Sequence, residues 1–218
     1  EKPNFTLKFN EFVAGQKLLG VRKVRLSNAA MDSTYLQEWL AWHLFTAAGV
    51  VTPRVNFARV ELNGRDLGLY VMVEGVTKDF LKLNWGTDKG SVYEADEVDI
   101  DGGLEQDYGK RNRHQSDLGA LVAAINETDS KRRLERLNQA IDVKQFASYV
   151  AAEVLMNVWD GYSLRINNYR VFSNHDNDKV YFVPHGLDRI FEDPADPIMP
   201  EWKGRVTQTL MAIPETRK

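Results

Sequence analysis

The chain contains 218 residues, of which 43% are hydrophobic and 27% charged, as in an ordinary globular protein and unlike a disordered or collagen-like chain. It contains no cysteine, which excludes disulfide bonds, zinc fingers, iron–sulfur clusters and thiol catalysis. The net charge of −3 argues against a general nucleic-acid-binding protein. No apolar run approaches the roughly 20 residues of a membrane-spanning helix, so we expect neither a nucleic-acid partner nor a membrane span.

The first third of the chain predicts a small antiparallel sheet, because apolar and polar residues alternate in several short runs. The expected strands are residues 5–9, 21–26, 55–62 and 68–73. The last two flank Asn63-Gly64, a pair that strongly favours a tight hairpin turn.

One helix is expected within this sheet region, over residues 28–49, with Asp32 or Ser33 as its cap and Gly49 at its end. Its apolar residues recur at helical spacing, which predicts a buried stripe. The stripe consists of Leu36, Trp39, Leu40, His43 and Leu44.

The rest of the chain changes character and is mainly helical. Helical patterns cover residues 78–83, 118–125, 131–141, 142–159 and 205–212. Strand patterns cover residues 91–93, 168–172 and 180–183, the last two as a hairpin. The order predicts an α+β protein with a sheet lobe at 1–74 and a mainly helical lobe with a hairpin at 75–218. The two lobes form one functional domain, as in two-lobed phosphotransferases.

An acidic stretch interrupts the second lobe. Seven acidic residues and no basic residue lie between Glu94 and Asp107. Such a stretch is more often a loop that recognises a basic segment of a substrate, or a solvated loop, than the calcium loop that Glu97, Asp99 and Asp101 imitate.

Three polar side chains stand where predicted elements end. Asp160 follows the long helix, Asn168 begins a strand, and Asp188 follows the hairpin. Two carboxylates and an amide oxygen suit an open magnesium site that leaves positions for phosphate oxygens. Phosphoryl transfer needs such a metal and a carboxylate that accepts the proton of the attacking hydroxyl. The competing interpretation is ordinary capping of turns and strand ends by Asp and Asn.

Several motifs, in order and over most of the chain, resemble the spore coat protein H (CotH) kinase family. The runs that carry the resemblance are NFTLKF, VRLSNAAMDSTYLQEWLAWHLF, GVVTPRVNFARVELNGRDLGLYVMVEGV, WDGYSLRINNYRVF and FVPHGLDRIF. The resemblance implies an atypical protein-kinase-like fold that binds ATP with Mg²⁺ and transfers phosphate to serine or threonine of a protein substrate. By matched position, Asp160 is the catalytic carboxylate, and Asn168 and Asp188 are the metal ligands.

The sheet lobe offers candidates for the nucleotide site. Kinase-like folds use a strand lysine to hold the phosphates and a helix glutamate to orient it, which points to Lys8 and Glu38. Lys23 and Lys2 are rivals for the lysine. The strand that ends at Glu74 resembles the one leading into a kinase hinge, where backbone groups near Glu74 meet adenine.

Some residues depart from the family pattern. Gln37 stands where many members have arginine, and His185-Gly186 replaces a Trp-Asp or similar pair. The family's arginine-, glycine- and serine-containing loop is expected ahead of Glu1.

We therefore expect an ATP- and Mg²⁺-dependent protein kinase. The alternatives are a pseudokinase that acts as a surface or spore-coat binding module, and an enzyme that transfers the nucleotide instead of phosphate. The resemblance favours a secreted, cell-surface or spore-surface location.

Overall fold

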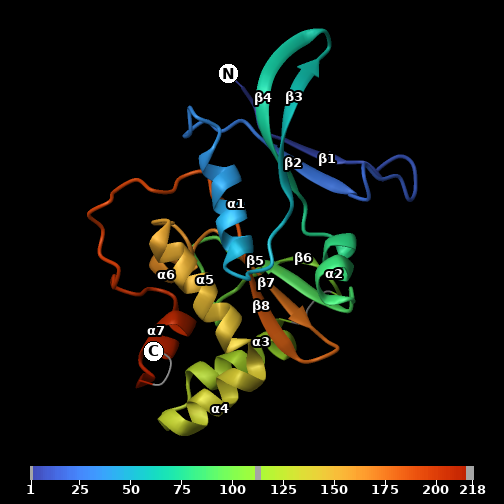
Figure 1. The fold of residues 1–218 in the computed structure, drawn as a ribbon. Helices are drawn as coiled ribbons and strands as arrows, with labels where there is room; N and C mark the ends of the chain where they lie inside the picture. Colours follow the sequence, from blue (N-terminus) through green and yellow to red (C-terminus); the bar gives the residue numbers. More distant parts are fainter. Residues whose placement is uncertain (1, 111–113, 215–218) are drawn as a thin grey trace.

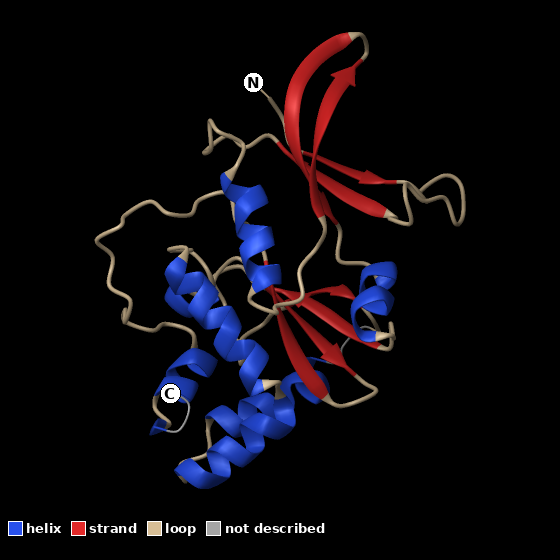
Figure 2. Ribbon diagram, viewed as in Figure 1, coloured by secondary structure: helices blue, strands red, loops and turns tan. Residues whose placement is uncertain are grey.

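The computed structural model describes residues 2–110 and 114–214, which form two four-stranded antiparallel sheets, with most of the helices gathered around the second sheet (Figure 1, Figure 2). The first sheet has strand order β1-β2-β4-β3, and the second has β6-β5-β7-β8. The strands are β1 (Phe5–Lys8), β2 (Lys23–Ser27), β3 (Val55–Leu62), β4 (Arg65–Glu74), β5 (Gly90–Glu94), β6 (Glu105–Tyr108), β7 (Tyr169–Asn174) and β8 (Lys179–Pro184). The helices are α1 (Gln37–Ala47), α2 (Lys78–Trp85), α3 (His114–Ile125), α4 (Ser130–Ala140), α5 (Val143–Leu155), α6 (Tyr162–Arg165) and α7 (Arg205–Met211). The predicted mixed α+β class is confirmed.

The β3–β4 hairpin projects from the first sheet, at the top of Figure 1. Asn63 and Gly64 both have positive φ, +53° and +78°, as the expected two-residue hairpin turn requires. Because the turn uses only these two residues, β4 begins at Arg65, three residues earlier than predicted. The hairpin prediction is confirmed.

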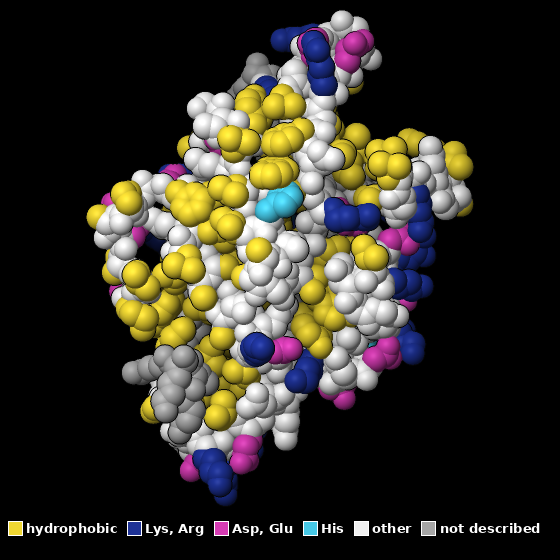
Figure 3. Space-filling view, in the orientation of Figure 1, with side chains coloured by type: hydrophobic (Ala, Val, Ile, Leu, Met, Phe, Trp, Pro, Cys, Tyr) yellow, Lys and Arg dark blue, Asp and Glu magenta, His cyan; other side chains and the backbone are white. Residues whose placement is uncertain are grey.

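Helix α1 differs from its prediction in both start and orientation. It begins at Gln37, because the preceding residues form a turn in which Asp32 Oδ2 accepts a hydrogen bond from the Gln37 N–H over 2.7 Å. Its buried face carries Glu38, Ala41, Trp42 and Phe45. The predicted stripe faces outward instead, with Leu36 53% exposed, and Figure 3 shows hydrophobic side chains gathered over this helix. The helix is apolar on nearly every side, so its spacing alone does not select the face that packs.

The second sheet lies between helices. On one face, Phe80 and Leu81 of α2 pack against Phe172 of β7. On the other, Phe146 of α5 packs against Phe182 of β8, with ring centroids 4.6 Å apart. The sequence predicted only three of its four strands, since β6 forms inside the acidic stretch.

Helix α5 begins as predicted, with Asp142 Oδ1 accepting a hydrogen bond from the Gln145 N–H over 3.0 Å. It ends at Leu155, four residues before the predicted end. The next residues form a tight turn in which the Val158 N–H donates to the Glu153 carbonyl over 2.8 Å.

The acidic stretch is tied to internal partners. Asp99 accepts hydrogen bonds from the Tyr162 hydroxyl (3.0 Å) and the Arg205 N–H (2.8 Å). Glu94 forms an ion pair with Arg170, and Asp101 with Arg205. At least part of the stretch is therefore structural, and its acids hold α7 and β7 in place.

A single cluster of buried side chains connects the two sheets. It includes Val71 and Val73 of β4, Phe45 of α1, Tyr149 of α5 and Val171 of β7. Figure 1 shows α1 standing between the first sheet and the helices beside the second. Within 2–110 and 114–214, no helix has both the length and the apolar character needed to cross a membrane.

Candidate active site

A hydrogen bond joins two of the predicted site residues. Asp160 lies in the turn after α5, and Asn168 directly precedes β7, with φ +48°. The Asn168 side-chain amide donates to Asp160 Oδ2 over 2.6 Å. Asp160 Oδ1 is buried and has no hydrogen-bond partner in the described part of the chain. One oxygen of this carboxylate is therefore held, and the other is left for a ligand proton or cation.

Asp188 follows β8 and lies near acids from both parts of the chain. Burial raises the pKa of Asp160, and the negative charge of Asp188 raises it further. Burial also raises the pKa of Glu38 on α1, where the charge of Asp188 adds to burial and the charge of Arg25 opposes it. The three carboxyl groups thus share one region, where negative charge favours a cation.

Gly186 makes room for Asn168. Its φ of +61° lies in the left-handed region, and a Cβ atom added there would lie 2.5 Å from Asn168 Oδ1 and 2.6 Å from its Cγ. The backbone N–H of the preceding residue, His185, donates to the Asn168 carbonyl over 3.0 Å. Asn168 can therefore take its observed position only because residue 186 has no side chain. An aspartate at position 186 would need a different local backbone.

The oxygen atoms at this site fit a magnesium ion that takes only a few ligands from the protein and the rest from phosphate oxygens and water. No group of three or more acidic or histidine side chains is placed to hold a metal ion, as far as residues 2–110 and 114–214 show. The available donors are the Asp188 carboxylate, the Asn168 amide oxygen and the unpartnered Oδ1 of Asp160. Mg²⁺ prefers such hard oxygens and commonly fills its other positions with water and phosphate oxygens.

Glu38 is paired with a cation that the sequence did not single out. The Arg25 guanidinium on β2 donates to Glu38 Oε1, and the Glu38 side chain is only 1% exposed. In this structure the Glu38 carboxylate pairs with Arg25 rather than with Lys8, and contact of Lys8 with phosphate stays a prediction. Arg25 on an inner strand of the sheet reaches α1, whereas Lys8 ends the edge strand β1 and is exposed.

The two rival lysines lie elsewhere. Lys2 Nζ donates to the Tyr35 hydroxyl and lies 4.1 Å from the centre of the Tyr70 ring. Lys23 Nζ lies 3.7 Å from Asp107 Oδ2, and its aliphatic chain crosses Gly75 so closely that a Cβ atom there would lie 2.7 Å from it. Of these two, Lys23 is the one beside the segment that joins the two sheets.

Glu74 is held inside the protein. Its carboxylate accepts two hydrogen bonds of 2.8 Å from the Arg54 guanidinium. Its backbone N–H donates to the Arg54 carbonyl (2.9 Å), and the Gly75 N–H donates to the Lys23 carbonyl (2.7 Å). These two N–H groups are engaged, so adenine would have to meet other backbone groups of the connecting segment.

A cluster of three side chains borders the site and was missed by sequence reasoning. Arg170 Nη2 donates to Glu94 Oε2 (2.7 Å), and His185 Nε2 lies 3.2 Å from Glu94 Oε1. Hydrogen bonding from His185 and the charge of Arg170 lower the pKa of Glu94 to about 2. Burial lowers the pKa of His185, and the positive charge of Arg25 contributes, which places Arg25 near this cluster. His185 was visible as a departure from the family pattern, but its partners come from strands distant in sequence.

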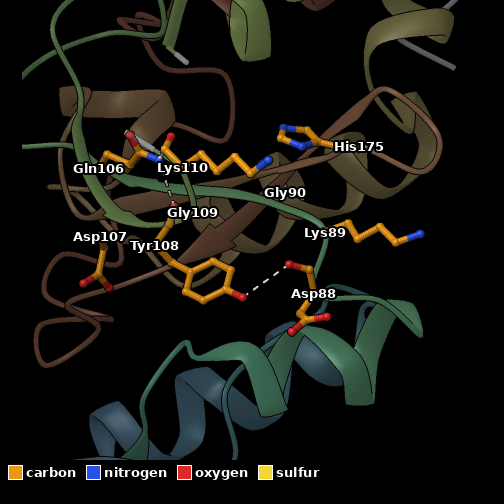
Figure 4. Close-up of a pocket in the computed structure, with 9 residues that line it drawn as sticks. All are labelled: Asp88, Lys89, Gly90, Gln106, Asp107, Tyr108, Gly109, Lys110 and His175. Carbon is orange, nitrogen blue, oxygen red and sulfur yellow. Dashed lines mark hydrogen bonds between the residues drawn. The ribbon is translucent and has the colours of Figure 1, made fainter. Parts of the chain in front are cut away.

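A separate pocket of about 760 Å³ lies between the ends of β5 and β6 (Figure 4). Its lining residues are Asp88, Lys89, Gly90, Gln106, Asp107, Tyr108, Gly109, Lys110 and His175. Lys89 is paired with Asp176, and His175 with Asp117. None of the predicted site residues lines this pocket.

The acids, amide and ion pair described above have the residue types of a phosphotransferase site, and comparison with known proteins points to a kinase family. The model of the CotH kinase protein family matches residues 1–217, so the chain belongs to the CotH kinase family. It is also similar to the inner spore coat protein H of Bacillus subtilis (strain 168), with 22% identity over 183 residues. This match covers 78% of the chain and 50% of the relative, so the chain spans about half of the relative's length.

Proposed function

We propose that the chain is a protein kinase that uses ATP and Mg²⁺ to phosphorylate serine or threonine of a protein substrate. In this proposal, residues 1–74 and 75–218 are the two lobes of a kinase-like fold, and the nucleotide binds between them. The observation that supports it best is the convergence of Asp160, Asn168 and Asp188 with the Arg25–Glu38 ion pair of the other lobe.

Each lobe contributes a separate part of the phosphate site. Arg25, held by the buried Glu38, takes the place expected for Lys8 and directs positive charge toward the phosphates. Asn168 and Asp188 would hold Mg²⁺, which would supply positive charge to offset the negative charge of the phosphate groups. The backbone around Gly75 and Val76 borders the base.

Asp160 accepts the proton in the transfer step. As the substrate hydroxyl oxygen bonds to the γ-phosphorus, the bond from that phosphorus to the β,γ-bridging oxygen breaks and ADP leaves. The hydroxyl proton goes to the Asp160 carboxylate, whose Oδ1 has no competing partner in the described region. Burial raises the pKa of Asp160, which makes its carboxylate a better base.

A pseudokinase is the second candidate, and Gly186 is the observation in its favour. Without a carboxylate at this position, Asp188 and the Asn168 amide are the two side chains proposed to hold the metal. Such a protein would bind nucleotide weakly or without turnover and serve as a binding module.

The test uses Asp160→Asn, which keeps the size of the side chain and an oxygen acceptor for the Asn168 amide. With γ-labelled ATP and a serine-rich protein substrate, we expect a fall in transfer of roughly 10²- to 10⁴-fold. Asp142→Asn is the matched control, because this helix cap is a remote Asp that Asn can replace. Unchanged transfer in Asp160→Asn would contradict the role of Asp160.

Parallel reactions separate the alternatives. Binding of ATP with no label transferred by the wild-type protein indicates the pseudokinase. Label incorporated from α-labelled ATP indicates nucleotide transfer.

The relative's name places that protein in the inner spore coat. We propose a cell- or spore-surface location for this chain as well, which fractionation of spores and cells with an antibody to the chain would test.

A further inference from the structure

Glu153 is a buried acid that lies directly beneath the turn carrying Asp160. It belongs to the last turns of α5 and is 1% exposed. Glu153 Oε1 accepts a hydrogen bond from the Tyr162 N–H over 2.9 Å, and Oε2 accepts one from the Ser163 N–H over 3.0 Å. Both oxygens are therefore used to hold backbone groups two and three residues beyond Asp160.

The turn is closed on its other side by the backbone of the same residue. The Glu153 carbonyl accepts the Val158 N–H over 2.8 Å, and the Val158 carbonyl accepts the Gly161 N–H over 3.0 Å. Asp160 thus lies between two backbone segments that Glu153 holds, one through its carbonyl and one through its carboxyl group.

Gly161 shows how closely the carboxyl group approaches the turn. A Cβ atom at position 161 would overlap with Glu153 Oε1 and would also lie 3.1 Å from the Val158 carbonyl oxygen. A glycine next to Asp160 is therefore required by the contact with Glu153.

Burying an acid near the end of a helix costs free energy, because the carboxyl group loses its hydration, whereas an apolar side chain of similar size would not have this cost. An apolar residue here would leave two buried N–H groups without acceptors. Neither of these N–H groups belongs to Asp160, yet both fix the backbone that carries it.

We infer that Glu153 is a positioning residue for Asp160, holding the catalytic carboxylate in register with Asn168; this inference rests on the proposed function. Asp160 Oδ2 receives the Asn168 amide from β7, so small movements of the turn separate the pair. A misplacement of about 1 Å can lower a rate roughly 100-fold.

The test compares Glu153→Gln with wild type. Glutamine has nearly the same shape, but its NH₂ group faces one of the two backbone N–H groups and cannot accept from it. We expect kcat for phosphate transfer to fall roughly 100-fold while KM for ATP stays within about twofold. Hydrogen exchange at the Tyr162 and Ser163 amides becomes faster.

Gly161→Ala is a second variant that disturbs the same contact from the side of the turn, and we expect the same pattern. Thr207→Val is the matched control. Thr207 is fully buried, and its hydroxyl lies 3.1 Å from the Ser163 hydroxyl, so it contacts a side chain and neither of the two backbone N–H groups that Glu153 holds. We expect loss of the Thr207 hydroxyl to leave both hydrogen bonds of the Glu153 carboxyl group in place and kcat near that of wild type.

Wild-type kcat and unchanged amide exchange in Glu153→Gln would overturn the inference. So would a rise in KM for ATP as large as the fall in kcat, because that indicates a general loss of structure. If the wild-type protein transfers no phosphate, the proposed function fails. Amide exchange then decides separately whether Glu153 holds the turn. Faster exchange in Glu153→Gln supports that role, and unchanged exchange overturns it.

Discussion

Gly186→Ala probes the contact that distinguishes this site from the expected family pattern. The new side chain meets two separate costs. Alanine in the left-handed conformation at φ +61° costs about 1–2 kcal/mol. Its Cβ would also lie 2.5 Å from Asn168 Oδ1, and relieving such an overlap in packed surroundings costs about 1–3 kcal/mol more.

Gly49→Ala separates the two costs. Gly49 has φ +82°, and a Cβ atom added there meets no atom within 4 Å. It therefore carries the conformational cost alone, about 1–2 kcal/mol. We expect Gly186→Ala to lower the free energy of unfolding by about 2–5 kcal/mol, more than Gly49→Ala does.

The overlap also has a functional consequence. We expect Asn168 to relieve it by moving, which breaks or lengthens its 2.6 Å hydrogen bond to Asp160. Gly186→Ala should therefore weaken binding of Mg²⁺ in the presence of ATP, and Gly186→Asp should do the same despite its added carboxylate.

The assays are urea unfolding for stability and titration calorimetry for Mg²⁺ in the presence of ATP. Equal losses of stability and equal Mg²⁺ binding in Gly186→Ala and Gly49→Ala would refute a clash between position 186 and Asn168. Tighter Mg²⁺ binding by Gly186→Asp would show that the backbone adapts and that a third carboxylate completes the site.

Three further predictions concern buried acids. Arg25→Met leaves Glu38 buried without its ion pair and should lower the free energy of unfolding, measured with urea, by about 1–3 kcal/mol. The double variant with Glu38→Gln should lose less stability than the sum of the two single variants. Strict additivity would show that the two side chains do not interact. Arg54→Ala removes the two guanidinium hydrogen bonds of buried Glu74, keeps the one from the Arg54 backbone N–H, and should cost about 1–3 kcal/mol. Arg59→Ala breaks the exposed pair with Asp66 and should change stability by less than about 1 kcal/mol; equal effects of the two variants would contradict this. Burial raises the pKa of Glu153 from 4.5 to about 7. Between these two pH values the folded state keeps a proton that the unfolded state loses, so the free energy of unfolding falls by on the order of 3 kcal/mol as pH rises through this range. Urea unfolding of Glu153→Gln should lack this contribution, and parallel pH profiles for the two proteins would refute it.

Several features of the fold follow from residues that are close in sequence. Asn63 and Gly64 supply the positive φ angles of the β3–β4 turn, and Asp142 supplies an acceptor for the first turn of α5. Such signals act within a few residues, so they predict the structure whatever surrounds them.

The sequence by itself also determined the motifs, including Asp160, Asn168 and Asp188, that placed the chain in its family. Only the tertiary structure decided which residues the buried polar side chains contact. Glu38 pairs with Arg25, which an inner strand of the first sheet carries to α1. Helix α1 is apolar on both sides, and packing against the common buried cluster selects the side with Trp42 instead of the side with Trp39. The predicted end of α5 was wrong because the turn that ends the helix depends on contacts formed later in the chain. Glu153 accepts hydrogen bonds from Tyr162 and Ser163 only after the chain has turned back toward the helix. Contacts of this kind depend on the arrangement of elements in space, which short-range periodicity does not encode.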